Sequence, residues 1–196
     1  MVPGMLAMAL WFTASAVGPL VTPWERRART YERLLSCPIS LGALVGGDVL
    51  SGLLFGVGFS LVPILLGAAL TDAHVVHWPL VAAGLVVGAS AFSALGVLLA
   101  APPVNSPSHI MMLSNLVRLP LLFISGVFVP LAKMPGWARA LAPVSPLSYA
   151  TDLMRRAYGE PAYFPAWLDV GALVGFAVLL WLAALWFHHR TRARGL

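Results

Sequence analysis

Charged side chains are scarce in this chain of 196 residues and are unevenly spread along it. Lysine and arginine together number 12, and aspartate and glutamate number 7. No cation occurs between Arg33 and Arg118, where Asp48 and Asp72 are the only charged residues. A soluble domain covers its surface with charged and polar groups, so this scarcity excludes a water-soluble globular protein.

Two further absences limit the chemistry of the chain. Cys37 is the only cysteine, which excludes an internal disulfide and a cysteine-based metal site. Lys133 is the only lysine and lies between alanine and methionine, whereas a P-loop needs Gly-Lys followed by Ser or Thr. His74 and His77 have no cysteine, aspartate pair or third histidine nearby in the sequence, and no nucleophile-elbow sequence occurs. We therefore expect no catalytic residue, no bound metal and no ATP hydrolysis by this chain.

Long apolar runs separate the few charged segments, and hydrophobic residues make up 60% of the chain. Crossing a hydrocarbon core takes about 20 helical residues. A lone strand would leave its backbone groups unpaired in lipid, so each run is expected to be a helix. The predicted fold is an all-α, polytopic membrane bundle in a single transmembrane domain, residues 1–196. Its five spans are expected near residues 2–21, 44–70, 79–101, 110–131 and 168–187.

The basic residues at the joints predict the orientation. The joint at 24–43, the joint at 102–109 and the C-terminal tail hold seven arginines in all. The other side holds four basic residues, all of them in the joint at 132–167. Cytoplasmic loops carry an excess of Lys and Arg. The side with seven arginines is therefore expected to face the cytoplasm, in a multi-pass protein of the cell membrane.

Residues 24–35, after the first span, have the pattern of an amphipathic helix. At 100° per residue Trp24, Tyr31 and Leu35 share one face, and charged side chains occupy the other. Pro38 ends this helix before the next span. Two interpretations fit the pattern. The helix lies flat on the membrane surface as an anchor, or it docks a cytoplasmic partner through a polar face with charges of both signs.

The joint at 132–167 is divided by prolines into short helices, expected at 135–141 and 146–158. In the second helix the apolar and the charged residues occupy opposite faces. The apolar face holds Leu147, Ala150, Met154 and Ala157, and the charged face holds Asp152, Arg155 and Arg156. We expect interfacial helices that cap the outer end of the bundle, or a polar lid that satisfies helix ends.

Arg118 is the one cation inside an expected span. A charged residue at the centre of a span costs about 2.5–3.5 kcal/mol on insertion scales. Three arrangements lower this cost. The side chain reaches the membrane surface from a helix that starts near Ser114, it faces a pathway through the bundle, or it pairs with a carboxylate such as Asp48. Arg118 and Asp48 are therefore candidates for a pathway or a helix-pairing contact.

Two stretches resemble sequences of the ABC-2 type transporter permeases. The first, ERRARTYERLLSCPIS at residues 25–40, resembles the family's cytoplasmic loop, in which charged residues precede a Leu-Leu-x-x-Pro element and the next span. The second, LSNLVRLPLLFISGVFVPLAKMPGWARALAPVSPLSYATDLMRR, covers residues 113–156. It resembles the family's Ser-Gly-x-x-x-Pro span end, its Pro-x-Trp helix and its Pro-Leu-x-Tyr turn. Together with the spans between and after them, the two stretches cover nearly the whole chain.

The resemblance implies roles for residues in both stretches. The first would dock an ATPase through Glu25, Arg26, Arg29, Tyr31, Glu32 and Leu35. The second would form an outer cap through Ser125, Gly126, Pro130, Trp137, Pro146, Tyr149, Asp152 and Arg155. The family usually has six spans, and this chain matches from the second onward, so we expect the family's first span to be missing from it.

The resemblance also implies a function. Such permeases are the membrane-spanning subunits of ATP-binding cassette exporters, they pair as homodimers or heterodimers, and a separate ATPase subunit binds ATP and Mg. The expected cargo is hydrophobic or amphipathic, such as a drug, lipid or glycan, and the chain itself would bind no cofactor and no nucleic acid. Two alternatives stay open. One is a truncated remnant that does not transport, and the other is a membrane-embedded assembly factor or lipid-modifying enzyme.

Overall fold

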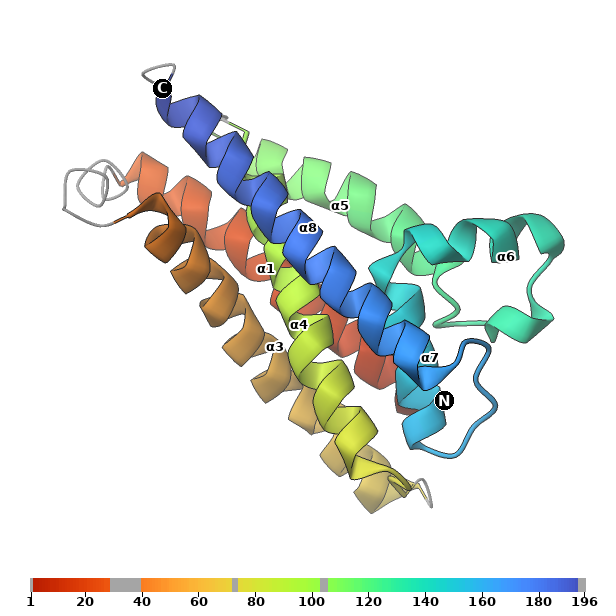
Figure 1. Ribbon diagram of the computed structural model, residues 1–196. Coiled ribbons are helices and arrows are strands. Elements are labelled where there is room, and N and C mark those ends of the chain that lie inside the picture. The colour runs from red at the N-terminus through yellow and green to blue at the C-terminus, as the bar shows by residue number, and fades with distance from the viewer. Residues whose placement is uncertain (1, 29–39, 72–73, 103–105, 194–196) are drawn as a thin grey trace.

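The structure is a computed structural model that describes residues 2–28, 40–71, 74–102 and 106–193 (Figure 1). Within these ranges all regular structure is helical. The α-helices are α1 (Val2–Arg27), α3 (Leu41–Leu70), α4 (Trp78–Ala100), α5 (Pro107–Ile124), α6 (Gly136–Leu141), α7 (Pro146–Ala157) and α8 (Ala166–Ala193). Two short 3-10 helices, η1 (Leu131–Lys133) and η2 (Ala142–Val144), flank α6.

Five of the described helices are long and apolar enough to cross a bilayer. Their spanning segments are Val2–Glu25, Gly42–Leu70, Trp78–Ala100, Pro107–Ile124 and Ala166–His188. The predicted all-α membrane bundle is therefore confirmed. The largest difference from the predicted boundaries is at α5, which ends at Ile124 and not near residue 131. The helix stops there because Gly126 has a φ of 82°, in the left-handed region that ends helices.

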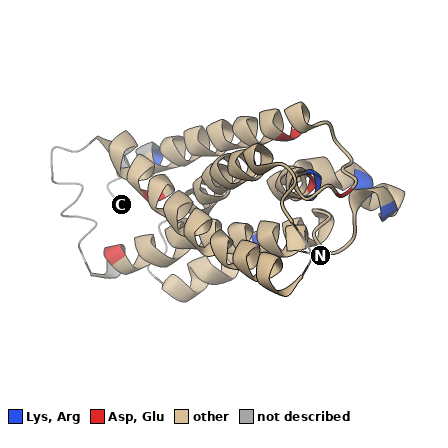
Figure 2. Cartoon of the chain, turned by 90° about the horizontal axis from the view of Figure 1, so that it is seen from below, with Lys and Arg blue, Asp and Glu red and all other residues tan. Residues whose placement is uncertain are grey.

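The long helices alternate in direction, so their ends collect at two ends of the bundle (Figure 1). The cap end holds the start of α1, the end of α3, the start of α4 and the chain from the end of α5 to the start of α8. The far end holds the ends of α1, α4 and α8 and the starts of α3 and α5. Figure 2 shows most charged residues near these two ends, with long uncharged stretches of helix between them. Such a distribution is typical of a multi-pass membrane chain.

Helix α1 touches α4 backbone to backbone toward the far end of the bundle. A Cβ added to Gly18 would lie 2.7 Å from the Gly96 carbonyl carbon, and one added to Gly96 would lie 2.5 Å from the Ser15 carbonyl oxygen. Small residues allow this close approach between membrane helices. Farther along the same interface Trp11 and Phe92 pack edge to face, with ring centres 4.8 Å apart. The α1–α4 pair therefore forms the centre of the core.

Helix α7 is more deeply buried than its amphipathic pattern suggests. Leu147 and Leu153 are 0% exposed, and Asp152 on the predicted charged face is 3% exposed. The helix contacts α1, α4 and α8 at the cap end. Its polar face is thus covered by protein, and α7 is part of the bundle at this end.

Candidate functional site

The predicted docking segment lies mainly outside the described residues. Those outside are Arg29, Tyr31, Glu32, Leu35 and the side chain of Arg26. Residues 24–27 continue α1 without a break, although Pro23 precedes them. Trp24 is exposed there and Glu25 is half-buried. The docking role of this segment therefore stays a prediction.

The chain turns sharply between α5 and the cap. Ser125 is buried, and its hydroxyl donates to the Leu122 carbonyl at 2.6 Å, which closes the last turn of the helix. Gly126 follows with its positive φ, and a Cβ there would lie 2.9 Å from Cγ of Leu131. Pro130 then precedes η1. Three predicted cap residues thus form the turn that leads from the span into the cap.

Asp152 holds the joint that leads into α8. Its carboxylate accepts the N–H of Tyr163 at 2.8 and 2.9 Å and the N–H of Phe164 at 2.8 Å. Burial raises the pKa of the Asp152 carboxyl above its usual value, although these N–H groups and the nearby Arg156 and Arg155 favour the charged form. The carboxylate therefore fixes the start of α8 against α7.

Tyr149 fills the space beside this joint. Its hydroxyl donates to the Pro143 carbonyl at 3.2 Å. Its ring lies 5.2 Å from that of Phe164 and 6.2 Å from that of Phe176 on α8. Burial, with a smaller contribution from the charge of Asp169, raises the pKa of the Tyr149 hydroxyl. Tyr149 thus packs α7 against both the joint and α8.

Arg155 connects three parts of the cap. Its Nη1 forms a salt bridge with Oε2 of Glu160 at 3.0 Å. Its Nη2 donates to the carbonyls of Gly126 at 3.1 Å and Val127 at 3.4 Å. Since Gly126 and Val127 follow α5 and Glu160 precedes α8, Arg155 joins α7 to both neighbouring segments.

The remaining predicted cap residues, Pro146 and Trp137, take different positions. Pro146 is the first residue of α7 and is buried. A helix leaves its first N–H unbonded, so proline is well suited to this place. Trp137 in α6 is 68% exposed and does not join the buried cluster.

Three cap residues were not singled out from the sequence. Arg139 donates to three carbonyls between residues 131 and 134, at 2.9 to 3.3 Å. Arg156 donates to the Phe164 carbonyl. Ser145 donates to the Leu121 carbonyl, in the last turn of α5, at 3.2 Å. All of these acceptors are backbone carbonyls, and residue type carries no signal for such contacts.

Arg118 lies inside the bundle and is 2% exposed. Because α5 begins at Pro107, Arg118 is eleven residues into the helix. Its Nη1 donates to Oγ of Ser15 on α1 at 3.1 Å, and its Nη2 donates to Oδ1 of Asn115 at 3.0 Å. The helix start predicted near Ser114 is therefore wrong. The interpretation that the side chain reaches the membrane surface fails with it.

Asp48 is not a partner of Arg118 in the described part of the chain. The side-chain bonds of Arg118 go to α1 and to its own helix. Asp48 lies in the first turns of α3, at the far end, where it is half-buried and interacts electrostatically with Glu25 of α1. The predicted pairing of these two residues is therefore not present.

Asp169 is a buried carboxylate that was also not singled out from the sequence. It lies in the first turn of α8 and is 0% exposed. Its two carboxylate oxygens accept no hydrogen bond from the described residues. The N-terminus of a helix favours negative charge, which is consistent with a carboxylate in this turn.

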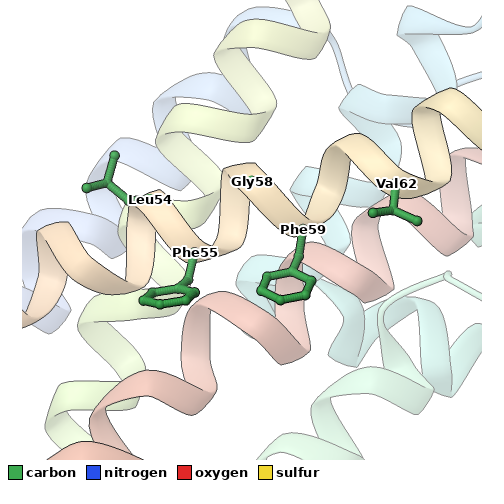
Figure 3. A pocket seen from close by; sticks show the side chains of 5 residues that line it. All are labelled: Leu54, Phe55, Gly58, Phe59 and Val62. Carbon is green, nitrogen blue, oxygen red and sulfur yellow. The ribbon is translucent and has the colours of Figure 1, made fainter.

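An apolar groove of about 370 Å³ runs along α3 (Figure 3). It is lined by Leu54, Phe55, Gly58, Phe59 and Val62. Phe55 and Phe59 project from the same side of the helix, with stacked rings 6.4 Å apart. A second groove of about 230 Å³ adjoins it where these two rings meet α1. Both surfaces offer apolar contact and no charged group from the described residues.

The arrangement as a whole offers packing and hydrogen bonding. The carboxylate of Asp152 accepts backbone N–H groups, and Arg155 bonds to backbone carbonyls and to Glu160. Among the described residues no three His, Cys, Asp or Glu side chains are placed to hold a metal ion. Chemically, the structure can fix the helices at the cap end and can present one buried cation, Arg118, in the middle of the bundle.

Comparison with known proteins identifies relatives along most of the chain. Residues 1–158 match the family model of the ABC-2 type transporter. The chain is 28% identical to the Nodulation protein J of Bradyrhizobium diazoefficiens, over 97% of this chain and 73% of the relative. It is 30% identical to the Daunorubicin resistance ABC transporter permease protein DrrB1 of Streptomyces coeruleorubidus, over 85% of this chain and 48% of the relative. It is 26% identical to the Inner membrane transport permease YadH of Escherichia coli, over 92% of this chain and 70% of the relative.

The chain therefore spans only part of the length of each of these relatives. The family match covers far more than half of the chain and agrees with its five apolar helices. The chain belongs to the ABC-2 type transporter family and is a multi-pass membrane permease subunit of an ABC exporter.

Proposed function

We propose that the chain forms, with a second permease subunit of its own or a related kind, the pathway by which a hydrophobic or amphipathic cargo crosses the membrane. The observation that carries the proposal is the family match over residues 1–158, on a chain with five helices able to span a bilayer. The apolar character of these helices fits such a cargo, and one relative is named for resistance to the drug daunorubicin.

The energy for transport comes from a separate ATPase subunit, which binds ATP and Mg. The sequence of this chain supports the division, since its single lysine lies outside any P-loop pattern. ATP binding and hydrolysis in the partner would bias the permease between two arrangements by differential contacts. This chain binds no cofactor of its own in the proposal.

The ATPase docks on the segment at residues 24–35. The residues of this chain that make the contact are Glu25, Arg26, Arg29, Tyr31, Glu32 and Leu35. Support comes from residues 24–27, which form the last turn of α1 at the end of the bundle opposite the cap. The far end, where Arg190 lies in the last turn of α8, faces the cytoplasm. The cap end then covers the outer side of the pathway.

Affinity capture tests the proposal. The tagged chain is expressed at native level, extracted in detergent and isolated, and the proteins that accompany it are identified by mass spectrometry. We expect an ABC ATPase and a permease subunit among them. The double variant Tyr31→Glu, Leu35→Glu should lose the ATPase and keep the permease partner. Trp137→Glu is the control, because it places a glutamate on an exposed aromatic position at the cap end.

Three outcomes would contradict the proposal. Recovery of the chain without any ATPase would favour a remnant that does not transport. Loss of the ATPase in the Trp137→Glu variant, with retention in the double variant, would move the docking surface to the cap end. Recovery of lipid-modifying or assembly proteins in place of an ATPase would favour the assembly role.

A further inference from the structure

Arg118 carries a full positive charge, because a guanidinium stays protonated in proteins. The described residues form one salt bridge, between Arg155 and Glu160, and place no carboxylate against Arg118. Its bonds go to the neutral side chains of Ser15 and Asn115, and its Nε has no hydrogen-bond partner. Bonds between a cation and an anion are stronger than bonds to neutral acceptors. An anion that reached this guanidinium would therefore bind more strongly than its present partners.

A second buried polar group without a partner lies one turn away. Ser114 precedes Arg118 by four residues and shares its face of α5 with Ile110 and Leu122, the other buried residues of the helix. Its side chain is 0% exposed, and its hydroxyl has no hydrogen-bond partner among the described residues. Buried polar groups are usually hydrogen-bonded. The buried face of α5 thus has apolar residues at its ends and two incompletely bonded polar groups between them.

The depth of Arg118 argues against the lipid headgroups as the source of an anion. Arg118 lies six residues before the end of α5 at Ile124 and eleven residues after its start. At 1.5 Å per residue these separations are about 9 and about 16 Å. Headgroups lie about 15 Å from the centre of the bilayer. The anionic group of a molecule that crosses the membrane passes this depth, whereas a headgroup in either leaflet stays outside it.

Helix α5 makes less contact with the other described spans than any of them does. It contacts the other long helices mainly at α1, through the face that holds Ser114 and Arg118. Its opposite face is open, with Leu116 69% and Phe123 65% exposed. By contrast α1 and α4 touch backbone to backbone. Movement of α5 away from α1 would uncover the guanidinium and leave the contact between α1 and α4 intact.

We propose that Arg118, with Ser114 and Asn115, binds a single anionic group, a phosphate or a carboxylate, of an amphipathic cargo during its passage. The guanidinium supplies the charge, and the Ser114 hydroxyl supplies a further donor. Phe12, whose ring centre lies 6.0 Å from the guanidinium carbon, supplies apolar contact to the rest of the cargo. The proposal rests on the transport function proposed above and adds the charge of the cargo to it.

The test compares two probes that differ only in their head. The full chain, purified with the subunits that accompany it, is placed in nanodiscs of phosphatidylcholine. Binding of NBD-labelled dodecyl phosphate and of NBD-labelled dodecanol is measured by fluorescence anisotropy. The parent should bind the phosphate about tenfold more tightly or better, and Arg118→Gln should remove this preference. Lys133→Gln, which removes a cation from an exposed position in the cap, should keep the preference in full.

Equal preference in the parent and in a folded Arg118→Gln variant would overturn the proposal. If that variant does not fold, binding of the two probes by the variants Arg118→Lys and Ser114→Ala provides the test. Each should weaken binding of the phosphate probe about threefold or more and leave binding of the alcohol unchanged. Unchanged affinity for both probes in both variants would overturn the proposal equally.

Two further measurements separate the alternatives. In nanodiscs that contain phosphatidylglycerol, binding of the phosphate probe should stay the same. If phosphatidylglycerol displaces the probe from the parent and not from Arg118→Lys, the site belongs to a lipid headgroup and the assignment to cargo is wrong. If an ATPase is recovered but the parent binds the phosphate probe and the alcohol probe equally well, this inference is wrong and the transport function stands. Absence of the ATPase would contradict the transport function.

Discussion

Helices α3 and α7 reverse the relation between hydropathy and burial that holds in soluble proteins. Helix α3 consists almost wholly of apolar and small residues, yet its Leu65 and Leu70 are 67% and 77% exposed. Helix α7 includes Asp152 and two arginines, yet its Leu147 and Leu153 are 0% exposed. The more hydrophobic helix is thus the more exposed one.

The cause of this difference is the solvent. An apolar side chain has the same surroundings in lipid as in a protein core, so no hydrophobic force draws α3 inward. Polar groups near a membrane need partners from the protein. Those of α7 find them in the segments on either side, through Asp152 and Arg155. Of these two helices, the uniformly apolar α3 is therefore the one suited to contact lipid, and α7, of mixed composition, is the one held by protein contacts.

The largest expected effect compares one leucine from each helix. Leu153→Ala should lower the free energy of unfolding by about 3 kcal/mol, because it leaves a cavity in a packed core. Leu65→Ala, on the exposed face of α3, should cost about 0.5 kcal/mol, since it changes only transfer into lipid. Unfolding in mixed detergent micelles measures both. Similar costs for the two changes would show that α3 is covered by protein in the assembled complex.

The second largest expected effect on stability compares one polar residue from α7 with one from α3. Asp152→Ala should cost about 2 kcal/mol, because the N–H groups of Tyr163 and Phe164 lose their acceptor. Ser51→Ala is the control, since its exposed hydroxyl bonds only to the Gly47 carbonyl within α3, and it should change stability by less than about 0.5 kcal/mol. A loss in the control as large as that in Asp152→Ala would contradict the comparison.

The stacked rings of α3 test whether exposed side chains on this helix stabilise one another. Phe55→Leu and Phe59→Leu, made singly and together, should give a coupling energy of about 0.5 kcal/mol from the ring contact. The two single changes should each have small effects, because both rings are more than half exposed. Additive effects in the double variant would mean that the rings contact lipid independently.

The smallest expected effect concerns pH. Because the pKa of Asp152 is raised in the fold, the folded chain keeps this proton to a higher pH than the unfolded chain. The resulting stabilisation is complete below the usual pKa of aspartate and is lost as the pH rises through the raised value. The stability of the parent relative to Asp152→Asn should therefore fall as the pH rises. A difference that does not change with pH would contradict this expectation.

The spans were predictable because a long apolar run is by itself the signal for a membrane-spanning helix. The five apolar helices overlap the runs seen in the sequence. The end of α5 was not, since apolar residues continue beyond Gly126 and only its backbone conformation stops the helix. The burial of α7 was missed because an amphipathic pattern shows two faces and does not show what covers the polar one.

The residues of the cap and the mid-bundle cation differ in how far the sequence could predict them. Proline, glycine and aromatic residues marked the cap region, although the turn at Ser125 and Gly126 lies inside the span predicted at 110–131. The partner of Arg118 could not be predicted, because Ser15 is 103 positions away in the chain and serine is common in membrane helices. The predicted docking residues lie largely beyond the described ranges and stay a prediction.

The bonds of α7 have a mechanical consequence. Its Ala157 carbonyl accepts the N–H of Val76 and His77, just before α4, at 2.9 and 3.0 Å. Arg155 holds the turn after α5, and Asp152 holds the residues before α8. The cap ends of three long helices are thus tied to one short helix. Helix α8 has 28 residues and is about 42 Å long, so a tilt of about 5° around its cap end moves its far end by about 4 Å. A rotation of α8 about its contact with α7 that is too small to disturb the cap therefore moves the far end of α8 by this distance on the opposite side of the membrane.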